Sequence, residues 1–139
     1  MRKLLCIGLL LVLLLTACQS VNSEELITVN QIKQAFEIEN IALKETSETL
    51  TGIFGSRLEN EKPLTFMLNE KLLLIYEFNS IEKRKKALEE FQKETESANT
   101  VSFKVYNVKN LLLIYIYEDE LSQELEQEIE GVIKKMNMD

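Results

Sequence analysis

Two stretches in the second half of the chain share the uninterrupted apolar run LLLIY. They begin at Leu72 and Leu111, 39 residues apart, and continue as EF and IY. A strand that is apolar on both faces is typical of the centre of a sheet whose two faces are both covered. Residues 101–106 instead alternate between apolar and polar positions, as an edge strand with one solvent-exposed face does. The pattern therefore predicts two central strands and one edge strand.

Turn residues and helix-capping residues divide this half of the chain into two hairpins, each followed by a helix. Polar residues at 69–70 and 107–110 predict tight turns. Asn79 and Asp119 are favourable N-cap residues, and each precedes a stretch whose apolar side chains recur at helical spacing. The expected elements are strands 64–68 and 72–78, helix 80–97, strands 101–106 and 111–117, and helix 119–136.

The repeated hairpin-helix pattern leaves two explanations open. An internal duplication would give two related units of the same fold. Convergence would give the same letters in two unrelated strands, because any strand that is buried on both faces needs apolar residues throughout. The two helices share few residues, so the sequence does not decide between these explanations.

The first half of the chain contains one clear helix. Thr28 and Gln31 have the spacing of a capping box. Asn40 can adopt the left-handed conformation that ends a helix. We therefore expect an N-terminal helix from about residue 28 to 40, followed by a short strand at 41–43.

Residues 45–63 have the least regular pattern. Polar residues, two glycines and the chain's single proline interrupt the segment, but it also contains four well-spaced apolar side chains: Leu50, Ile53, Phe54 and Leu58. Long structureless loops are uncommon in a small domain and are often functional. We expect an irregular flap over the core, with a strand at 50–58 as the alternative.

These elements assemble most simply into one α+β domain, residues 28–139. It has a small, mainly antiparallel sheet of four to five strands, a repeated hairpin-helix pattern and an N-terminal helix. The expected strand order is 65–68, 72–78, 111–117, 101–106. The two later helices are expected on one face, and the first helix with the 45–63 segment on the other. Any part of the sheet left uncovered would be an apolar patch for a partner.

The beginning of the chain has a different pattern. Arg2 and Lys3 precede an apolar run at 4–15, which is too short to span a bilayer comfortably. The run ends in Leu15-Thr16-Ala17-Cys18. This ending resembles the lipobox of bacterial lipoprotein signal peptides, which consists of a Leu, two small residues and the Cys that is modified. An ordinary secretory signal or an uncleaved membrane anchor is the alternative.

The lipobox resemblance implies how the mature protein begins. Cys18 would receive a diacylglyceryl thioether, the signal peptide 1–17 would be removed, and Cys18 would become the N-terminus. Residues 18–27 would then form a polar tether between the lipid, on the extracytoplasmic face of the cell membrane, and the domain. The remainder is similar to the short uncharacterised lipoproteins of Gram-positive bacteria, a similarity that implies no activity.

The charge balance narrows the classes of partner. The formal net charge is 16 − 23 = −7, and removal of Arg2 and Lys3 with the signal peptide gives 14 − 23 = −9. Anionic lipid repels an acidic domain, so membrane attachment must come from the lipid on Cys18. The same negative charge argues against nucleic acid as a partner, because phosphate binding needs a clustered Lys and Arg face.

Candidate catalytic residues are scarce. The chain has no His, and its two cysteines are Cys6 in the signal peptide and Cys18 at the lipidation site. It contains no Walker loop, no zinc-ligand spacing and no Ser-x-x-Lys motif. We therefore expect a protein that is not an enzyme, and the sequence assigns it no catalytic residue, no metal ligand, no cofactor and no ligand-binding residue.

Three clusters have both a functional and a structural interpretation. Glu118-Asp119-Glu120 could bind a cation, but more simply lies at a helix start, where acids are favoured. The basic run 83–86 could contact anionic lipid or an acidic partner, but more simply forms a solvated helix face. Four strand tyrosines could line a ligand pocket, but more simply belong to the core: Tyr76, Tyr106, Tyr115 and Tyr117.

Two hypotheses for function follow. The leading one is a lipid-anchored extracytoplasmic module for protein interaction at the cell envelope. It would be held at the membrane through Cys18 and would bind an envelope or membrane protein. The alternative is a small-ligand or ion-binding sensor domain in which residues 45–63 act as a lid.

Overall fold

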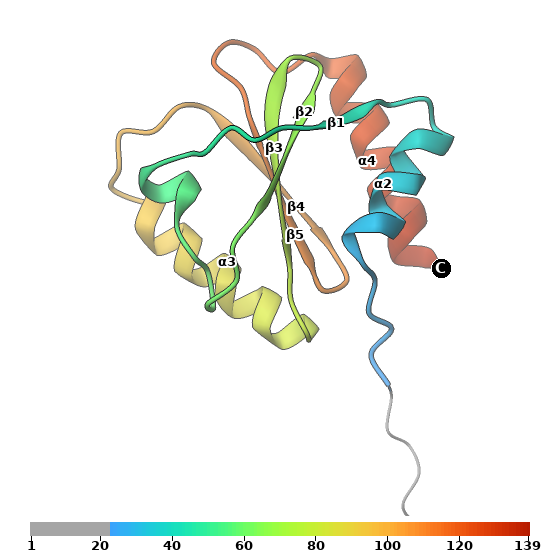
Figure 1. The fold of residues 1–139 in the computed structure, drawn as a ribbon, viewed down its shortest axis with the longest axis horizontal. Helices are drawn as coiled ribbons and strands as arrows, with labels where there is room; N and C mark the ends of the chain where they lie inside the picture. Colours follow the sequence, from blue (N-terminus) through green and yellow to red (C-terminus); the bar gives the residue numbers. More distant parts are fainter. Residues whose placement is uncertain (1–22) are drawn as a thin grey trace, which may run out of the picture.

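The computed structural model describes residues 23–139, so the predicted signal peptide and Cys18 lie outside the described residues. Residues 23–139 form three α-helices, one 3₁₀ turn and a five-stranded antiparallel sheet, which confirms the α+β class (Figure 1). In chain order the elements are α2 (Val29–Ile38), β1 (Leu43–Glu45), η1 (Gly52–Gly55), β2 (Leu64–Leu68), β3 (Lys71–Glu77), α3 (Ile81–Thr95), β4 (Phe103–Val108), β5 (Leu111–Ile116) and α4 (Gln123–Met138).

The sheet has the strand order β1-β2-β3-β5-β4. This order confirms the prediction for the four longer strands and places the two LLLIY strands together at the centre. The short strand β1 pairs with β2 as a fifth, edge strand. It begins at Leu43, two residues later than predicted, and the alternative strand at 50–58 is wrong, because the turn η1 lies there.

Helix α2 has both of its predicted ends. The Thr28 side chain accepts a hydrogen bond from the Gln31 N–H, and the Gln31 side chain accepts one from the Thr28 N–H, which confirms the capping box. After the helix, Asn40 has a φ of 61°, the left-handed conformation predicted for it. This turn directs the chain toward β1.

The predicted N-caps of the other two helices are wrong. Ser80 caps α3 in place of Asn79, and Ser122 caps α4 in place of Asp119. Each Ser side chain accepts a hydrogen bond from the backbone N–H three residues later. Because Ser, Asn and Asp are about equally good N-caps, residue type alone does not select among neighbouring candidates.

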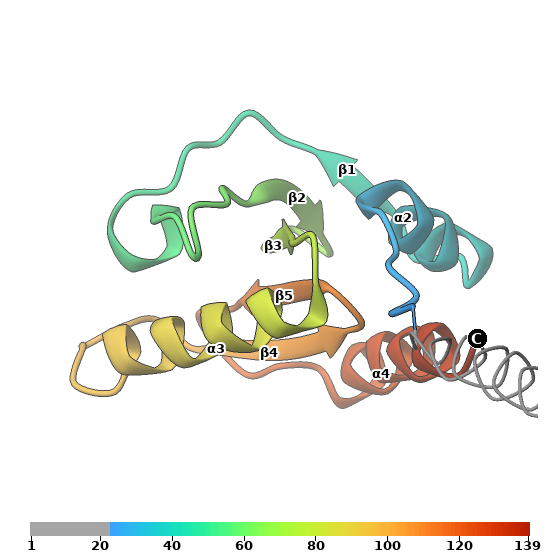
Figure 2. The ribbon, with the colours of Figure 1, turned by 90° about the horizontal axis from the view of Figure 1, so that it is seen from below.

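The helices that follow the two hairpins lie on opposite faces of the sheet, so the prediction that they share a face is wrong. Helices α4 and α2 cover one face, and α3 covers the other together with η1 and its flanking loop (Figures 1 and 2). Both faces of β3 and β5 are apolar and need a cover. The amphipathic pattern of a helix does not state which face it will cover, because that depends on the link before it.

The two LLLIY runs do not occupy equivalent positions. The hairpins are closed by the pairs Leu68↔Lys71 and Val108↔Leu111, so they correspond at an offset of 40 residues, whereas the runs repeat at 39. A shift of one residue reverses the direction of every side chain in a strand. Tyr76 accordingly faces α3, and its sequence counterpart Tyr115 faces α4. The repeat therefore reflects burial on both faces, which favours convergence over duplication.

Candidate functional site

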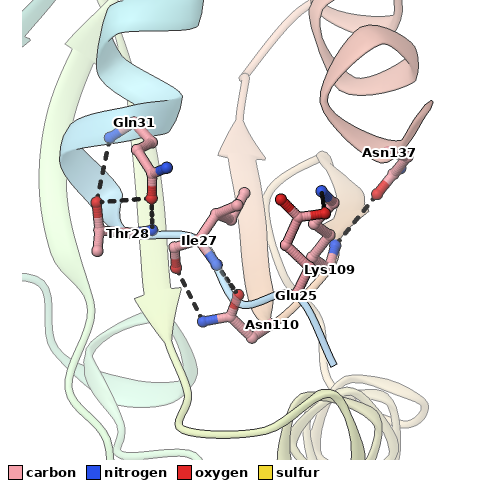
Figure 3. A network of polar contacts seen from close by, with 7 residues as sticks. All are labelled: Glu25, Ile27, Thr28, Gln31, Lys109, Asn110 and Asn137. Carbon is pink, nitrogen blue, oxygen red and sulfur yellow. Dashed lines mark hydrogen bonds and ion pairs between the residues drawn. The ribbon is translucent and has the colours of Figure 1, made fainter. Parts of the chain in front are cut away.

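Asn110 joins the N-terminal segment to the sheet. It is the buried polar residue among residues 23–139, with 2 % of its surface exposed. Its amide nitrogen donates a hydrogen bond to the carbonyl oxygen of Ile27 (3.0 Å), and its side-chain oxygen accepts one from the Ile27 N–H (2.7 Å; Figure 3). The amide nitrogen also donates to the carbonyl oxygen of Phe78 (2.7 Å). Both donor hydrogens and the acceptor are used, as a buried amide requires. Asn110 thus fixes a segment that lies 83 residues earlier in the chain.

Two carboxylates beside Ile27 add to this attachment. Glu24 accepts a hydrogen bond from the Ile81 N–H (3.0 Å) at the N-terminus of α3, where a negative charge is favourable. Glu25 forms an ion pair with Lys109 (3.0 Å; Figure 3). Ile27 itself is buried among the side chains of the α4 face. We call this set the N-terminal latch: Glu24, Glu25, Ile27, Ile81, Lys109 and Asn110.

The latch overlaps the predicted tether. Residues 18–27 were expected to be a polar linker, and the structure places the last four of them on the domain. Residues 18–22 lie outside the described part of the chain. A chain that leaves the domain therefore does so at Glu24, close to the start of α3 and the β4–β5 turn.

An open groove lies at the other end of the sheet. It has a volume of about 640 Å³ and lies among the α2–β1 link, the β2–β3 turn and the start of α4. Its floor consists of the buried side chains Ile41, Leu68 and Leu125. A second hollow of about 410 Å³ continues from it along α2 and shares the α2–β1 link. We call the first hollow the acidic groove, for the carboxylates described next.

The rim of the acidic groove has an excess of negative charge. Glu70 in the β2–β3 turn and Glu124 and Glu128 on α4 are exposed there, with Lys44 as the positively charged lining residue. The ion pairs and hydrogen bonds formed within residues 23–139 include none of these four side chains. The rim charges are therefore available to a ligand.

The groove lies between the end of α2, the β2–β3 turn and the start of α4, which meet at this end of the sheet without packing over one another. Asn40 turns the chain away from α2, and Asn69 and Glu70, with φ values of 48° and 64°, form the tight turn between β2 and β3. Ser122 starts α4 beside them. Local backbone conformation or helix capping fixes each of these three segments, so the shape of the groove follows from the fold.

The 45–63 segment packs on the face of the sheet that α3 covers. Leu58 is fully buried, and the Tyr76 hydroxyl donates a hydrogen bond to the carbonyl oxygen of Ser56 (2.9 Å). The Glu59 N–H donates to Glu90 on α3 (2.9 Å). A Cβ on Gly55 would lie 2.0 Å from the carbonyl oxygen of Leu50, so this turn needs Gly. Lifting the segment as a lid would expose the apolar cluster beneath it.

Three of the four tyrosines belong to the core, as the structural interpretation predicted, and Tyr117, just after β5, is partly buried against it. Tyr76, Tyr106 and Tyr115 are buried, and they are divided between the two faces of the sheet. Burial raises the pKa of Tyr76 and of Tyr106 far above its ordinary value. The Tyr106 hydroxyl has no hydrogen-bond partner within residues 23–139, in contrast to Tyr76.

Members of both charged clusters of the sequence have contacts within the domain. Residues 118–120 lie in the link before α4, where Glu118 contacts Lys71 (3.7 Å), and within residues 23–139 no group of three potential ligands could hold a metal ion. In the basic run 83–86, Arg84 donates hydrogen bonds to the carbonyl oxygen of Lys109 (3.1 Å) and to the Asn107 side chain (3.1 Å). Arg84 thus has a structural role beside the latch.

Sequence patterns did not point to the latch or the groove. Asn110 was assigned only to a turn, since an Asn before an apolar run is typical of any hairpin. One pattern could have indicated the groove. Glu124 and Glu128 have the same charge and lie one helical turn apart, with apolar Leu125 between them in the sequence.

Comparison of the chain with protein-family models, with curated proteins and with solved structures found no significant match. Among residues 23–139, no helix is long and apolar enough to cross a membrane.

Proposed function

We propose that the protein is a lipid-anchored, extracytoplasmic module that binds another protein at the cell envelope. Attachment is through a diacylglyceryl group on Cys18, inferred from the lipobox-like ending Leu15-Thr16-Ala17-Cys18. The observation that carries the proposal is the N-terminal latch, because it joins the segment that follows Cys18 to one defined end of the domain.

The latch limits how far the domain can move from its anchor. Cys18 and Glu24 are six positions apart (24 − 18 = 6), with five residues between them, and a fully extended chain spans at most about 21 Å over that distance. The latched end is thereby kept toward the membrane. Strand β3, seven residues long, adds about 20 Å between that end and the acidic groove. Such a short connection to the membrane suits a module that presents the end with the acidic groove to a partner.

Binding is favoured over catalysis by the shape and chemistry of the exposed surface. The acidic groove is open, and its carboxylates surround an apolar floor; the one hydroxyl among its lining residues, that of Ser122, accepts a hydrogen bond from the Leu125 N–H as the cap of α4. The chain has no His to act as a base near neutral pH. An open surface of this type leaves much of a bound group in contact with solvent, whereas small-molecule sites bury most of their ligand.

The alternative hypothesis, a small-ligand or ion sensor with residues 45–63 as a lid, has less support. The hydrogen bonds of Ser56 and Glu59 and the burial of Leu58 hold that segment on the sheet. A thermal-shift panel of metabolites and metal ions tests this alternative directly, because a ligand present at 100 times its dissociation constant stabilises the folded state by about 2.7 kcal/mol.

The anchor is tested by two matched cysteine substitutions in the full chain, expressed in bacterial cells. Cys18→Ala should abolish the lipid-modified N-terminus seen by mass spectrometry and release the domain from the membrane fraction. Cys6→Ala, within the predicted signal peptide, should leave both unchanged. A wild-type protein that keeps residues 1–17 and carries no lipid on Cys18 would instead establish an uncleaved anchor.

The interaction is tested by crosslinking the lipidated protein in living cells. One dominant protein partner, lost with Cys18→Ala although the released domain keeps the wild-type melting temperature, supports the proposal. An empty capture at normal surface levels contradicts it and makes the thermal-shift panel the decisive experiment.

A further inference from the structure

The acidic groove has the features of a docking surface for one kind of polypeptide. We propose that it binds a cationic, amphipathic segment of a partner protein. Apolar side chains of that segment would cover the groove floor, and its Lys or Arg side chains would lie against Glu124 and Glu128. The inference rests on the proposed function, because it names the surface through which the anchored module acts.

The floor provides the apolar half of the complementarity. Leu68, Ile41 and Leu125 are 1 %, 7 % and 9 % exposed, so they form a closed apolar floor, and partly exposed Met67 lines the groove beside them. Ala42 at the edge is exposed and leaves space beside them. Covering Ala42 and Met67 with apolar side chains removes apolar surface from water, the main favourable contribution to most protein association.

The rim provides the charged half, and a comparison along α4 shows that its carboxylates are distinctive. Glu126 and Glu130 lie on the side of α4 that faces β4, and both form ion pairs with Lys104 on that strand. Glu124 and Glu128 have no such partner among the described residues, and they repel each other at a spacing of four residues. A cation placed between them relieves this repulsion.

Other classes of ligand fit the groove less well. A bare divalent cation needs several converging oxygens, and within residues 23–139 no group of three acidic residues could hold a metal ion. Anionic ligands, including nucleic acid and anionic lipid, are repelled by the rim. The volume of about 640 Å³, open at the surface, accommodates several side chains of a polypeptide.

Site-specific photo-crosslinking of the full, lipidated chain in living cells tests this inference. A photoreactive phenylalanine analogue replaces Ala42 in the groove or, as a control, Glu89 on the far side of the molecule. The crosslinked segment of the partner is identified by mass spectrometry. From position 42 we expect a segment that carries several Lys or Arg residues at amphipathic spacing.

Charge reversal then provides the quantitative test. Glu124→Lys/Glu128→Lys should lower the crosslinking yield from position 42 at least about tenfold, because like charges at an interface cost several kcal/mol. Glu89→Lys/Glu96→Lys changes the net charge by the same amount, on an exposed residue of α3 and on its exposed C-cap, and should lower the yield less than about twofold. Equal melting temperatures of the two variants show that the loss is not caused by unfolding.

Each other outcome has a definite meaning. An acidic or uncharged crosslinked segment, a second copy of this chain, or equal loss of yield in both variants overturns the groove assignment. Capture from position 89 but not from 42 also overturns it, while the proposed interaction function stands. No capture from either position, with lipidated protein at normal surface levels, overturns both.

Discussion

The two hairpin turns of the sheet correspond in structure, but their polar residues have opposite surroundings. Asn110, in the β4–β5 turn, is buried and uses all of its side-chain hydrogen-bonding groups. Glu70, at the corresponding position of the β2–β3 turn, is exposed on the rim of the acidic groove. The difference indicates that polar groups at the latched end contribute to folding, whereas those at the groove end are free to bind.

Helix α4 repeats this contrast on a single element. Its residues Glu126 and Glu130 are paired with Lys104, and its residues Glu124 and Glu128 face the groove without a partner among the described residues. Substitutions at the two kinds of position should therefore differ in their effect on stability.

The largest effect is expected for Asn110→Leu. The change leaves the buried N–H and carbonyl groups of Ile27 and the carbonyl of Phe78 without their partner, which should lower the free energy of unfolding by about 3 kcal/mol. Glu70→Gln, the matched change in the other turn, should stay within about 0.5 kcal/mol of wild type. Urea unfolding measures both, and equal losses would remove the distinction between the two ends.

Alkaline pH should destabilise the fold through its buried tyrosines. Burial raises the pKa of Tyr76 and Tyr106 in the folded state, with nearby glutamates adding to the effect. Above the unfolded pKa of about 10, the unfolded chain loses protons that the folded chain retains, so stability falls as pH rises. The slope contributed by each tyrosine is about 1.4 kcal/mol per pH unit.

Urea unfolding between pH 9 and 11 measures this slope. The double variant Tyr76→Phe/Tyr106→Phe should show a clearly smaller decrease than wild type. A decrease of equal size would assign the alkaline effect to the lysines instead.

Substitution of these tyrosines one at a time compares a bonded with an unbonded hydroxyl. Tyr76→Phe removes a hydrogen bond to the Ser56 carbonyl and should cost about 1 kcal/mol. Tyr106→Phe removes a buried hydroxyl that has no partner within residues 23–139 and should be neutral or slightly stabilising. Thermal unfolding of the two variants measures the difference, and a larger loss for Tyr106→Phe would contradict the contrast.

The smallest effects are expected on α4 and have opposite signs. Glu128→Lys replaces a like-charge pair with Glu124 by a favourable one and should raise stability by about 0.5 kcal/mol. Glu126→Lys places a positive charge beside Lys104 and should lower stability by about 0.5 to 1 kcal/mol. Urea unfolding at low and high salt checks both signs, since each difference should shrink when salt screens the charges.

The local features of this fold are those that sequence patterns predicted well. The alternation of 101–106 and the unbroken apolar runs of the central strands report burial directly, and they led to the observed order β2-β3-β5-β4. The capping box of Thr28 and Gln31 was predicted because both partners lie within one turn of helix. The caps of α3 and α4 were missed because several neighbouring residues cap equally well.

The sequence by itself determined the apolar strands, the amphipathic helices and, as a prediction that concerns residues outside the structure, the lipobox-like ending at Cys18. Only the tertiary structure decided that α3 and α4 cover opposite faces, that Asn110 is buried rather than solvated, and that Glu124 and Glu128 line a groove. The reason is physical: periodicity records how much each residue is buried, whereas the partner of a polar group depends on links and contacts between segments far apart in the chain.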